Sequence, residues 1–354
     1  GIDDEMPMCG LIGGWGSDTT EWLMNSFTQC VNPLSNTNPT VAGGLVVNNG
    51  KIEYAVMKDE YRDGLRYMHK LFEEGLLDNQ TFLQDNTQFS ATMDASEGNK
   101  VAVYANGGVE NSEFWQQVDG EWQNWEILAP VAGPDGVRYS GRCIQTYFEG
   151  CLGVVSSTCK YPEIVVALFD FMASEDAAHH IGGGPEGIAW EYTDEGVSLS
   201  GGTPTYEQIT VPEDFDYVKE GGLPKAHANY RYTPDAMIQR GSAAYRGGLK
   251  NEDPSHSTEY WFQQCAGLDS QCAPDVTTLV PNLSFEGEDA RIVTEGTLTI
   301  GGYVNQALVQ FIDGSLDIEK DWDAYIERLE SMGVDEYDAA YQRTYDAYME
   351  AQGK

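Results

Sequence analysis

The chain has 354 residues, enough for about two domains, and its 41% hydrophobic content is ordinary for a globular protein. Acidic residues number 57 against 20 basic residues, which gives a formal net charge of −37. This charge argues against nucleic acid and anionic membranes as partners, because both bind basic surfaces, and it disfavours a highly anionic ligand. The sequence contains no apolar run of the roughly 18 residues that a membrane-spanning helix needs.

The predicted elements alternate between helix and strand. Residues 59–74 form the clearest helix, and Gly75 is expected to end it. The apolar stripe of this helix consists of Tyr61, Leu65, Met68 and Phe72. Short strands are predicted at 99–104 and 125–131, and the Gly-Pro-Asp-Gly run at 133–136 is typical of a turn.

A third strand is predicted at 150–156, and a helix follows with Pro162 in its first turn and a restart near Ser174. Its inward side chains are expected to be Val165, Leu168, Phe169 and Met172. The last stretch of the chain is mostly helical, with two aromatic stripes that are interpreted as packing. These stripes are Trp322, Tyr325, Ile326 and Leu329, then Tyr337, Tyr341, Tyr345 and Tyr348. Alternating strands and helices followed by a helical tail predict an α/β architecture.

No catalytic motif occurs in the sequence. The G-x-G-x-x-G match at 182–187 follows a helix and contains Pro185, whereas a dinucleotide site needs a preceding strand. A carboxylate pair for glycoside hydrolysis cannot be located among 57 acidic residues. The seven cysteines form no C-x-x-C motif, and Cys265 with Cys272 either form a disulfide or remain buried thiols.

Aromatic residues on predicted loops are the most informative group. Sugars present flat C–H faces that stack on aromatic rings, while their hydroxyls need polar partners. The predicted stacking residues are Trp15, Trp115, Trp190 and Tyr192. The predicted hydroxyl partners are Asn106, Arg142 and Glu186. For each ring, core packing remains an open alternative.

Six segments, taken in chain order, resemble segments of the extracellular solute-binding proteins of bacterial ABC transporters. Residues 61–78 (YRDGLRYMHKLFEEGLLD) resemble a conserved helix of this family, and 98–104 (GNKVAVY) resemble the strand that follows it. The other matching segments are 160–172 (KYPEIVVALFDFM), 186–191 (EGIAWE), and the closing pair 322–325 (WDAY) and 332–337 (MGVDEY). Together they point to the lipoprotein-type, oligosaccharide-binding branch of the family.

The resemblance implies a type II periplasmic-binding-protein fold, with two α/β lobes around a hinge and the ligand in the cleft between them. Most of the first lobe is expected to be missing. Residues 1–140 would then form mainly lobe two, 141–192 would cross back to lobe one, and 193–354 would supply a loop region and helices that pack on lobe two and the hinge. Without its partner segment, the 145–190 region is expected to expose apolar surface.

The resemblance also implies a calcium loop whose last two ligands would be Asp4 and Glu5, provided that the earlier part of the loop is present ahead of Gly1, in a protein that otherwise needs no cofactor. The implied function is capture of a carbohydrate, expected to be an oligosaccharide, and its delivery to a permease without chemical change. The protein would be an extracellular, lipid-anchored or periplasmic monomer. The alternatives are a glycoside hydrolase or lyase, and a surface module that adheres to glycans.

Overall fold

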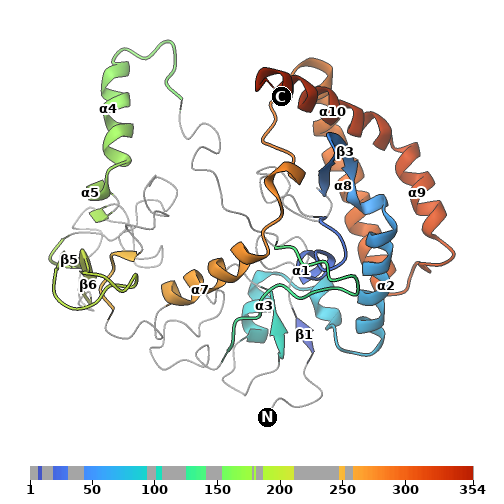
Figure 1. The fold of residues 1–354 in the computed structure, drawn as a ribbon, viewed down its shortest axis with the longest axis horizontal. Helices are drawn as coiled ribbons and strands as arrows, with labels where there is room; N and C mark the ends of the chain where they lie inside the picture. Colours follow the sequence, from blue (N-terminus) through green and yellow to red (C-terminus); the bar gives the residue numbers. More distant parts are fainter. Residues whose placement is uncertain are drawn as a thin grey trace. The chain divides into compact units, whose positions relative to one another are not determined.

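The computed structural model describes residues 7–9, 19–30, 44–93, 101–105, 125–140, 154–177, 179–180, 186–210, 247–251 and 258–353. The chain divides into two compact units (Figure 1). Unit 1 comprises residues 1–150 and 262–354, and unit 2 comprises residues 151–261. Each unit is described by itself below.

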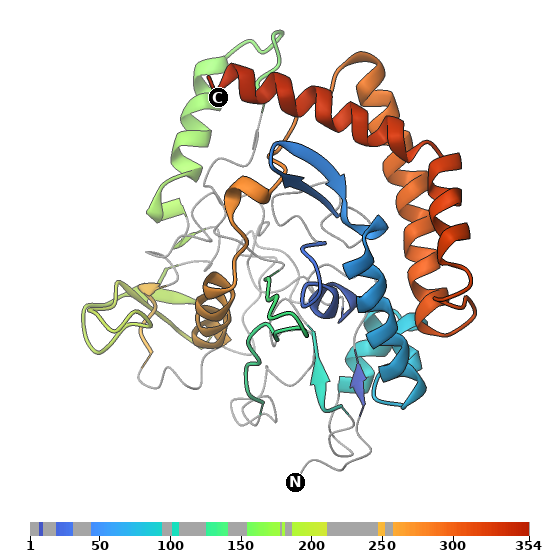
Figure 2. The same ribbon diagram turned by 45° about the vertical axis from the view of Figure 1, so that its right-hand side comes forward.

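Unit 1 contains most of the described helices. Its elements are β1 (Met8–Cys9), α1 (Thr19–Met24), β2 (Leu45–Asn48), β3 (Lys51–Tyr54), η2 (Ala55–Met57), α2 (Asp59–Glu73), η3 (Asn79–Phe82), α3 (Asn86–Met93), β4 (Val103–Tyr104), α7 (Thr258–Gln271, whose first residues belong to unit 2), η12 (Val276–Thr278), α8 (Gly287–Ile312), α9 (Trp322–Ser331) and α10 (Val334–Ala351). Helices α2, α8, α9 and α10 lie side by side in both views (Figures 1 and 2). Strands β1 and β4 pair in parallel, with Met8 opposite Val103.

The core of unit 1 lies between α2, the C-terminal helices and the β2–β3 hairpin. The predicted helix over 59–74 is confirmed as α2, and Gly75 follows it in the left-handed region at φ 73°. The buried members of the predicted stripes are Tyr61, Leu65, Met68, Trp322, Tyr325, Leu329, Tyr337 and Tyr345. Phe72, Ile326 and Tyr341 pack against them while partly exposed, whereas Tyr348 is exposed. The interpretation of the two C-terminal stripes as packing is therefore confirmed except at Tyr348.

The β2–β3 hairpin turns at Asn49 and Gly50, which have φ angles of 49° and 82°. Two consecutive positive φ angles match the type I′ turn, whose twist suits paired antiparallel strands, and Asn-Gly is its preferred sequence. The register pairs Asn48 with Lys51 and Leu45 with Tyr54. This register turns Tyr54 into the core, where it packs against Tyr337 at 6.1 Å between ring centroids.

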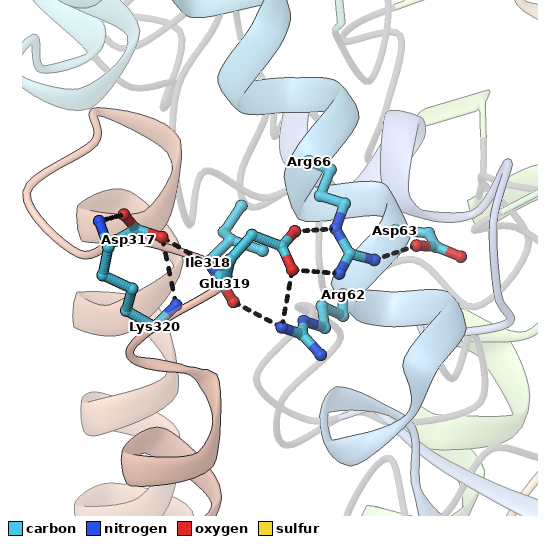
Figure 3. A network of polar contacts seen from close by, with 7 residues as sticks. All are labelled: Arg62, Asp63, Arg66, Asp317, Ile318, Glu319 and Lys320. Carbon is cyan, nitrogen blue, oxygen red and sulfur yellow. Dashed lines mark hydrogen bonds and ion pairs between the residues drawn. The ribbon is translucent and has the colours of Figure 1, made fainter.

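An ion-pair network joins α2 to the segment that precedes α9 (Figure 3). The Arg66 guanidinium donates two hydrogen bonds to the Glu319 carboxylate, at 2.5 and 3.0 Å, and also pairs with Asp63. Arg62 donates to Glu319 at 3.1 Å and lies over the Trp322 ring, 5.6 Å from its centroid. The hydrogen bond from Arg66 lowers the pKa of Glu319. The network fixes where the chain enters α9, although its exposed charges add little to stability.

The prediction of a strand over residues 125–131 is wrong. The segment is in no strand, because Pro130 lacks a backbone N–H and the Val131 carbonyl instead accepts a hydrogen bond from the Ser26 hydroxyl at 2.9 Å. The predicted turn at 133–136 is confirmed by the Gly136 N–H, which donates to the Gly133 carbonyl at 3.0 Å. A Cβ on Gly133 would lie 1.8 Å from the Ser26 carbonyl oxygen, so only glycine fits at this contact.

Unit 2 is smaller, and its described elements are α4 (Pro162–Met172), α5 (Glu175–Ala177), β5 (Trp190–Tyr192) and β6 (Tyr206–Gln208). Pro162 lies at the start of α4, as predicted. The predicted restart is confirmed as α5, where the Ser174 hydroxyl accepts a hydrogen bond from the Ala177 N–H at 3.1 Å. Of the strand predicted at 150–156, residues 154–156 are in no strand and the rest lie outside the described residues.

The inward stripe predicted for α4 is wrong at Leu168. No side chain of α4 is fully buried; Val165, Phe169 and Met172 are half-buried, and Leu168 is exposed. The expectation that this region exposes apolar surface is met.

The sequence left open whether Cys265 and Cys272, on and just after α7, form a disulfide. Cys265 and Cys272 are both thiols, since they stand about two helical turns apart, too far for the Cα separation that a disulfide requires.

Among the described residues, none of the helices combines enough length with enough apolar character to span a membrane.

Candidate saccharide site

A shallow hollow of about 650 Å³ opens in unit 2 beside strand β5. Its lining residues are Asp176, Tyr192, Thr193, Asp194, Pro204 and Thr205. They come from α5, from the end of β5 and from the segment that leads into β6. The lining thus combines one aromatic ring with its phenol hydroxyl, two carboxylates and two threonine hydroxyls.

The β5–β6 pairing places these groups. Trp190 lies opposite Gln208, and Tyr192 lies opposite Tyr206, so residues 190 and 192 share one face of the ribbon. The Thr193 N–H donates to the Thr205 carbonyl at 3.2 Å and closes the ribbon beside the hollow. The segment 247–251 supports the other edge, because the Gly248 carbonyl accepts from the Thr205 N–H at 2.8 Å.

Trp190 and Tyr192 differ sharply in burial although they share a face. Trp190 is only 1% exposed, and the His179 ring stacks on it with centroids 4.8 Å apart. Tyr206 packs edge-on against the same histidine at 4.5 Å. Tyr192 remains 52% exposed and lines the hollow. Trp190 is therefore a packing residue that supports the wall, and Tyr192 is the ring that a ligand can reach.

Polar contacts connect the hollow to Glu186. The Tyr192 hydroxyl donates to Asp176 Oδ1 at 3.4 Å. His180 Nδ1 lies 2.9 Å from the Asp176 backbone carbonyl, which can only accept, so this nitrogen carries a proton. The other ring nitrogen, Nε2, lies 3.9 Å from Glu186 Oε2. His180 thus links a lining carboxylate to a second carboxylate outside the hollow.

This arrangement suits binding of hydroxyl groups beside an apolar surface. The exposed Tyr192 ring offers a stacking surface, while Asp176, Asp194 and the two threonines offer hydrogen-bond acceptors and donors. The lining residues include no lysine or arginine. Within the described part of the chain, no group of three or more His, Cys, Asp or Glu side chains is placed to hold a metal ion.

Three of the seven predicted binding residues fall within the described chain, and they cluster. Glu186, Trp190 and Tyr192 all belong to the group around His179 and His180. The prediction that Trp190 is a stacking platform needs correction in this structure, because its ring is buried. The roles of Tyr192 and Glu186 stay predictions. Trp15, Asn106, Trp115, Arg142 and the predicted calcium ligands Asp4 and Glu5 lie outside the described residues.

Asp176, Thr193, Asp194 and Thr205 were not among the predicted binding residues. Thr193 and Asp194 directly follow Tyr192, so the polar run after an exposed aromatic residue was a usable signal. No sequence signal marked Asp176 or Thr205, because only the fold of unit 2 brings α5 and the segment before β6 to this hollow.

Comparison with known proteins shows which proteins this chain resembles in sequence and in fold. No family model matches it. It is 22% identical over 351 residues to the fructooligosaccharide ABC transporter substrate-binding protein FusA of Streptococcus pneumoniae, a match that covers 98% of this chain and 58% of FusA. The FusA EF-hand mutant in complex with fructo-nystose superimposes with a TM-score of 0.62 at 18% identity, over 98% of this chain and 64% of that one. A human-milk-oligosaccharide (HMO) binding, ABC-transporter-associated solute-binding protein from Bifidobacterium longum infantis superimposes with a TM-score of 0.66, at 18% identity and with 98% and 65% coverage.

This chain has the fold of the ABC-transporter solute-binding proteins. The resemblance predicted from the sequence, and the periplasmic-binding-protein fold that it implied, are confirmed. The chain spans 58% of the length of FusA and about two thirds of each solved structure. The predicted assignment of residue ranges to the two lobes stays a prediction.

Proposed function

We propose that this protein is the substrate-binding component of an ABC importer, which captures an oligosaccharide and delivers it unchanged to the permease. The observation that carries the proposal is the match to FusA, which extends over 98% of this chain. Oligosaccharides also occur in the names of the solved structures that share the fold. The proposed location is outside the cell or in the periplasm, as a monomer held by a lipid anchor.

Within this function, the hollow beside β5 contributes part of the saccharide site. The Tyr192 ring stacks on the apolar face of one sugar residue, and Asp176 and Asp194 accept hydrogen bonds from its hydroxyls. Glu186 orients His180, which in turn borders Asp176. The buried Trp190 holds the strand that carries Tyr192.

Calorimetric titration of the longest polypeptide that the gene encodes tests the proposal. The panel contains fructooligosaccharides, human milk oligosaccharides, peptides and polyamines. Saturable binding of at least one glycan, with no heat from peptides or polyamines, is expected. Binding of a peptide or polyamine in place of every glycan would overturn the proposed substrate class.

The enzyme alternative makes a different prediction about the fate of the glycan. If the protein only binds, mass spectrometry of the glycan after prolonged incubation recovers the starting material alone. A glycoside hydrolase or lyase would release shorter products, and replacing one lining carboxylate, as in Asp194→Asn, would abolish this release while leaving binding. The adhesion alternative would need no permease, so a permease gene beside this one supports the importer.

As part of the same proposal, calcium is a structural ion that the full-length protein binds. Asp4 and Glu5 can supply only part of the six to eight oxygens that calcium takes, so further ligands would have to come from other residues. The FusA structure named above is an EF-hand mutant, which supports looking for calcium here. A rise in unfolding temperature on adding calcium, reversed by a chelator, is the expected result.

A further inference from the structure

The hollow beside β5 has negatively charged groups on both sides of an exposed aromatic ring. The carboxylates of Asp176 and Asp194 line it together with Tyr192, and the lining includes no lysine or arginine. Asp176 and Asp194 are both exposed, and the Tyr192 ring is 52% exposed, so a ligand can reach all three groups at once. The hollow therefore presents a flat ring beside two acidic groups and no positive charge to balance them.

The lysines of unit 2 do not supply that positive charge. In the described part of this unit the lysines are Lys160 and Lys250, and there is no arginine. The Lys250 ammonium group pairs with Glu207 at 2.8 Å. Glu207 lies opposite Glu191 in the β5–β6 register, and alternate residues of a strand point to opposite faces, so this ion pair lies on the face of the ribbon away from Tyr192. Lys160 precedes α4, where its ammonium group lies over a tyrosine ring, 5.2 Å from the ring centroid.

The two carboxylates of the hollow differ in their neighbours. Asp176 Oδ1 accepts a hydrogen bond from the Tyr192 hydroxyl at 3.4 Å, and His180 Nδ1 lies 3.4 Å from the same oxygen. The Asp194 carboxylate has neither an ion pair nor a hydrogen bond with any residue that the structure describes. Asp194 is therefore the carboxylate that can give both of its oxygens to a ligand.

The lining also offers more hydrogen-bond acceptors than donors. An ionised carboxylate only accepts, and the Tyr192 hydroxyl already donates its proton to Asp176. The Thr193 hydroxyl accepts from the Glu195 N–H at 3.2 Å. A sugar hydroxyl donates one hydrogen bond, whereas a protonated amine has three N–H donors, no acceptor and a positive charge. A ligand with such an amine satisfies these acceptors better than a ligand with hydroxyls alone.

We propose that the hollow selects an oligosaccharide that carries a protonated amine, such as one built from glucosamine. This inference rests on the proposed function and adds the chemical class of the sugar residue. The amine replaces one hydroxyl and donates charge-assisted hydrogen bonds to Asp194, which are stronger than those from a neutral hydroxyl. The Tyr192 ring stacks on the apolar face of the same sugar residue, and its π-electrons attract the nearby positive charge.

Calorimetric titration of the longest polypeptide that the gene encodes tests the proposal with two matched ligands. One is an oligosaccharide of glucosamine. The other is the glucose oligosaccharide of the same length and linkage, which has a hydroxyl in place of each amine. The amine form is expected to bind at least about tenfold more tightly at low salt, and this preference should become smaller at high ionic strength. Equal affinities, or tighter binding of the glucose form, would overturn the proposal and leave the proposed function standing.

A pair of variants separates the hollow from the general negative charge of the chain. Asp194→Asn removes one carboxylate of the lining and should reduce the preference for the amine form to about threefold or less. Glu195→Gln removes the same charge from the next residue, which is exposed and is not part of the lining, and should keep the preference. An equal loss of preference in both variants would mean that the whole charge of the protein attracts the amine, which contradicts a specific site.

The remaining outcomes also decide the matter. If neither matched ligand binds but a fructooligosaccharide or human milk oligosaccharide does, the hollow does not select an amine, although the protein still captures glycans. If spermidine binds and no glycan does, the proposed function fails together with this inference.

Discussion

Trp190 and Tyr192 on β5 differ in burial, and we expect them to differ in function. Tyr192→Ala is expected to weaken glycan binding about tenfold or more, because it removes the exposed ring of the hollow, while folding stability changes little. Trp190→Ala is expected to lower the free energy of unfolding by about 3–5 kcal/mol, because it leaves a cavity beside His179. Calorimetry and urea unfolding measure the two effects. Tyr348→Ala, at an exposed tyrosine on α10, should change neither, and a comparable loss of affinity there would contradict the assigned role of Tyr192.

Asp338 on α10 is an acidic residue placed among tyrosines. Its Oδ1 atom is buried and accepts no hydrogen bond from the described residues. Burial, and secondarily the charge of Asp335, raises the pKa of Asp338 from 3.8 to about 7. Tyr54 and Tyr341 are the nearby titratable groups of β3 and α10. At neutral pH the fold therefore holds a carboxyl that is only partly ionised.

This raised pKa predicts a pH dependence of stability. Between about pH 4 and pH 7 the folded protein binds a proton at Asp338 that the unfolded chain has lost, so stability falls as pH rises through this window. Asp338→Asn should remove this slope and raise the free energy of unfolding at pH 8 by about 1–3 kcal/mol. Urea unfolding at pH 5 and pH 8 measures both. Asp323→Asn, at an exposed carboxyl of α9, is the control, and an unchanged slope in Asp338→Asn would refute the assignment.

At the scale of elements, α8 and α10 pack closely at a glycine. A Cβ on Gly296 would lie 2.3 Å from Cδ2 of the buried Tyr337 ring, whereas a Cβ on Gly302, also in α8, would meet nothing within 4 Å. Gly296→Ala should therefore lower the free energy of unfolding by about 1–3 kcal/mol through overpacking. Gly302→Ala should raise it by about 0.5–1 kcal/mol through helix propensity. Thermal unfolding of both variants checks the pair, and equal effects would mean that the α8–α10 contact is not tight.

Helices were easier to predict than their surroundings. The stripe of α2 could be read from spacing alone, because both the helix and its buried face depend on residues three and four apart. The same rule placed Leu168 of α4 inward, yet this side chain is exposed. Spacing shows that a face is apolar, but a neighbouring element has to be present before that face is buried.

At the scale of the whole molecule, the net charge of −37 and the two carboxylates of the hollow act together. An anionic ligand meets repulsion from both, and salt screens the long-range part. We expect a neutral oligosaccharide to bind at least about tenfold more tightly at low salt than a uronic-acid derivative of the same length. The difference in affinity between the two oligosaccharides should become smaller at high ionic strength and in the Asp194→Asn variant. Calorimetry at two salt concentrations measures it, and equal affinities would show that the hollow does not select by charge.

The sequence by itself determined the acidic composition and the buried stripes of α2, α9 and α10, because these properties depend on composition and short-range spacing. The resemblance to solute-binding proteins rests on the residues of several segments and on their order in the chain. Tertiary structure alone decided that the His179 ring covers Trp190, and that Asp176 and Thr205 line the same hollow as Tyr192. It also decided that the Val131 carbonyl accepts a hydrogen bond from the Ser26 hydroxyl and that Val131 belongs to no strand. Each of these outcomes depends on a contact between separate elements, and no local pattern in one element specifies which surface of another will reach it.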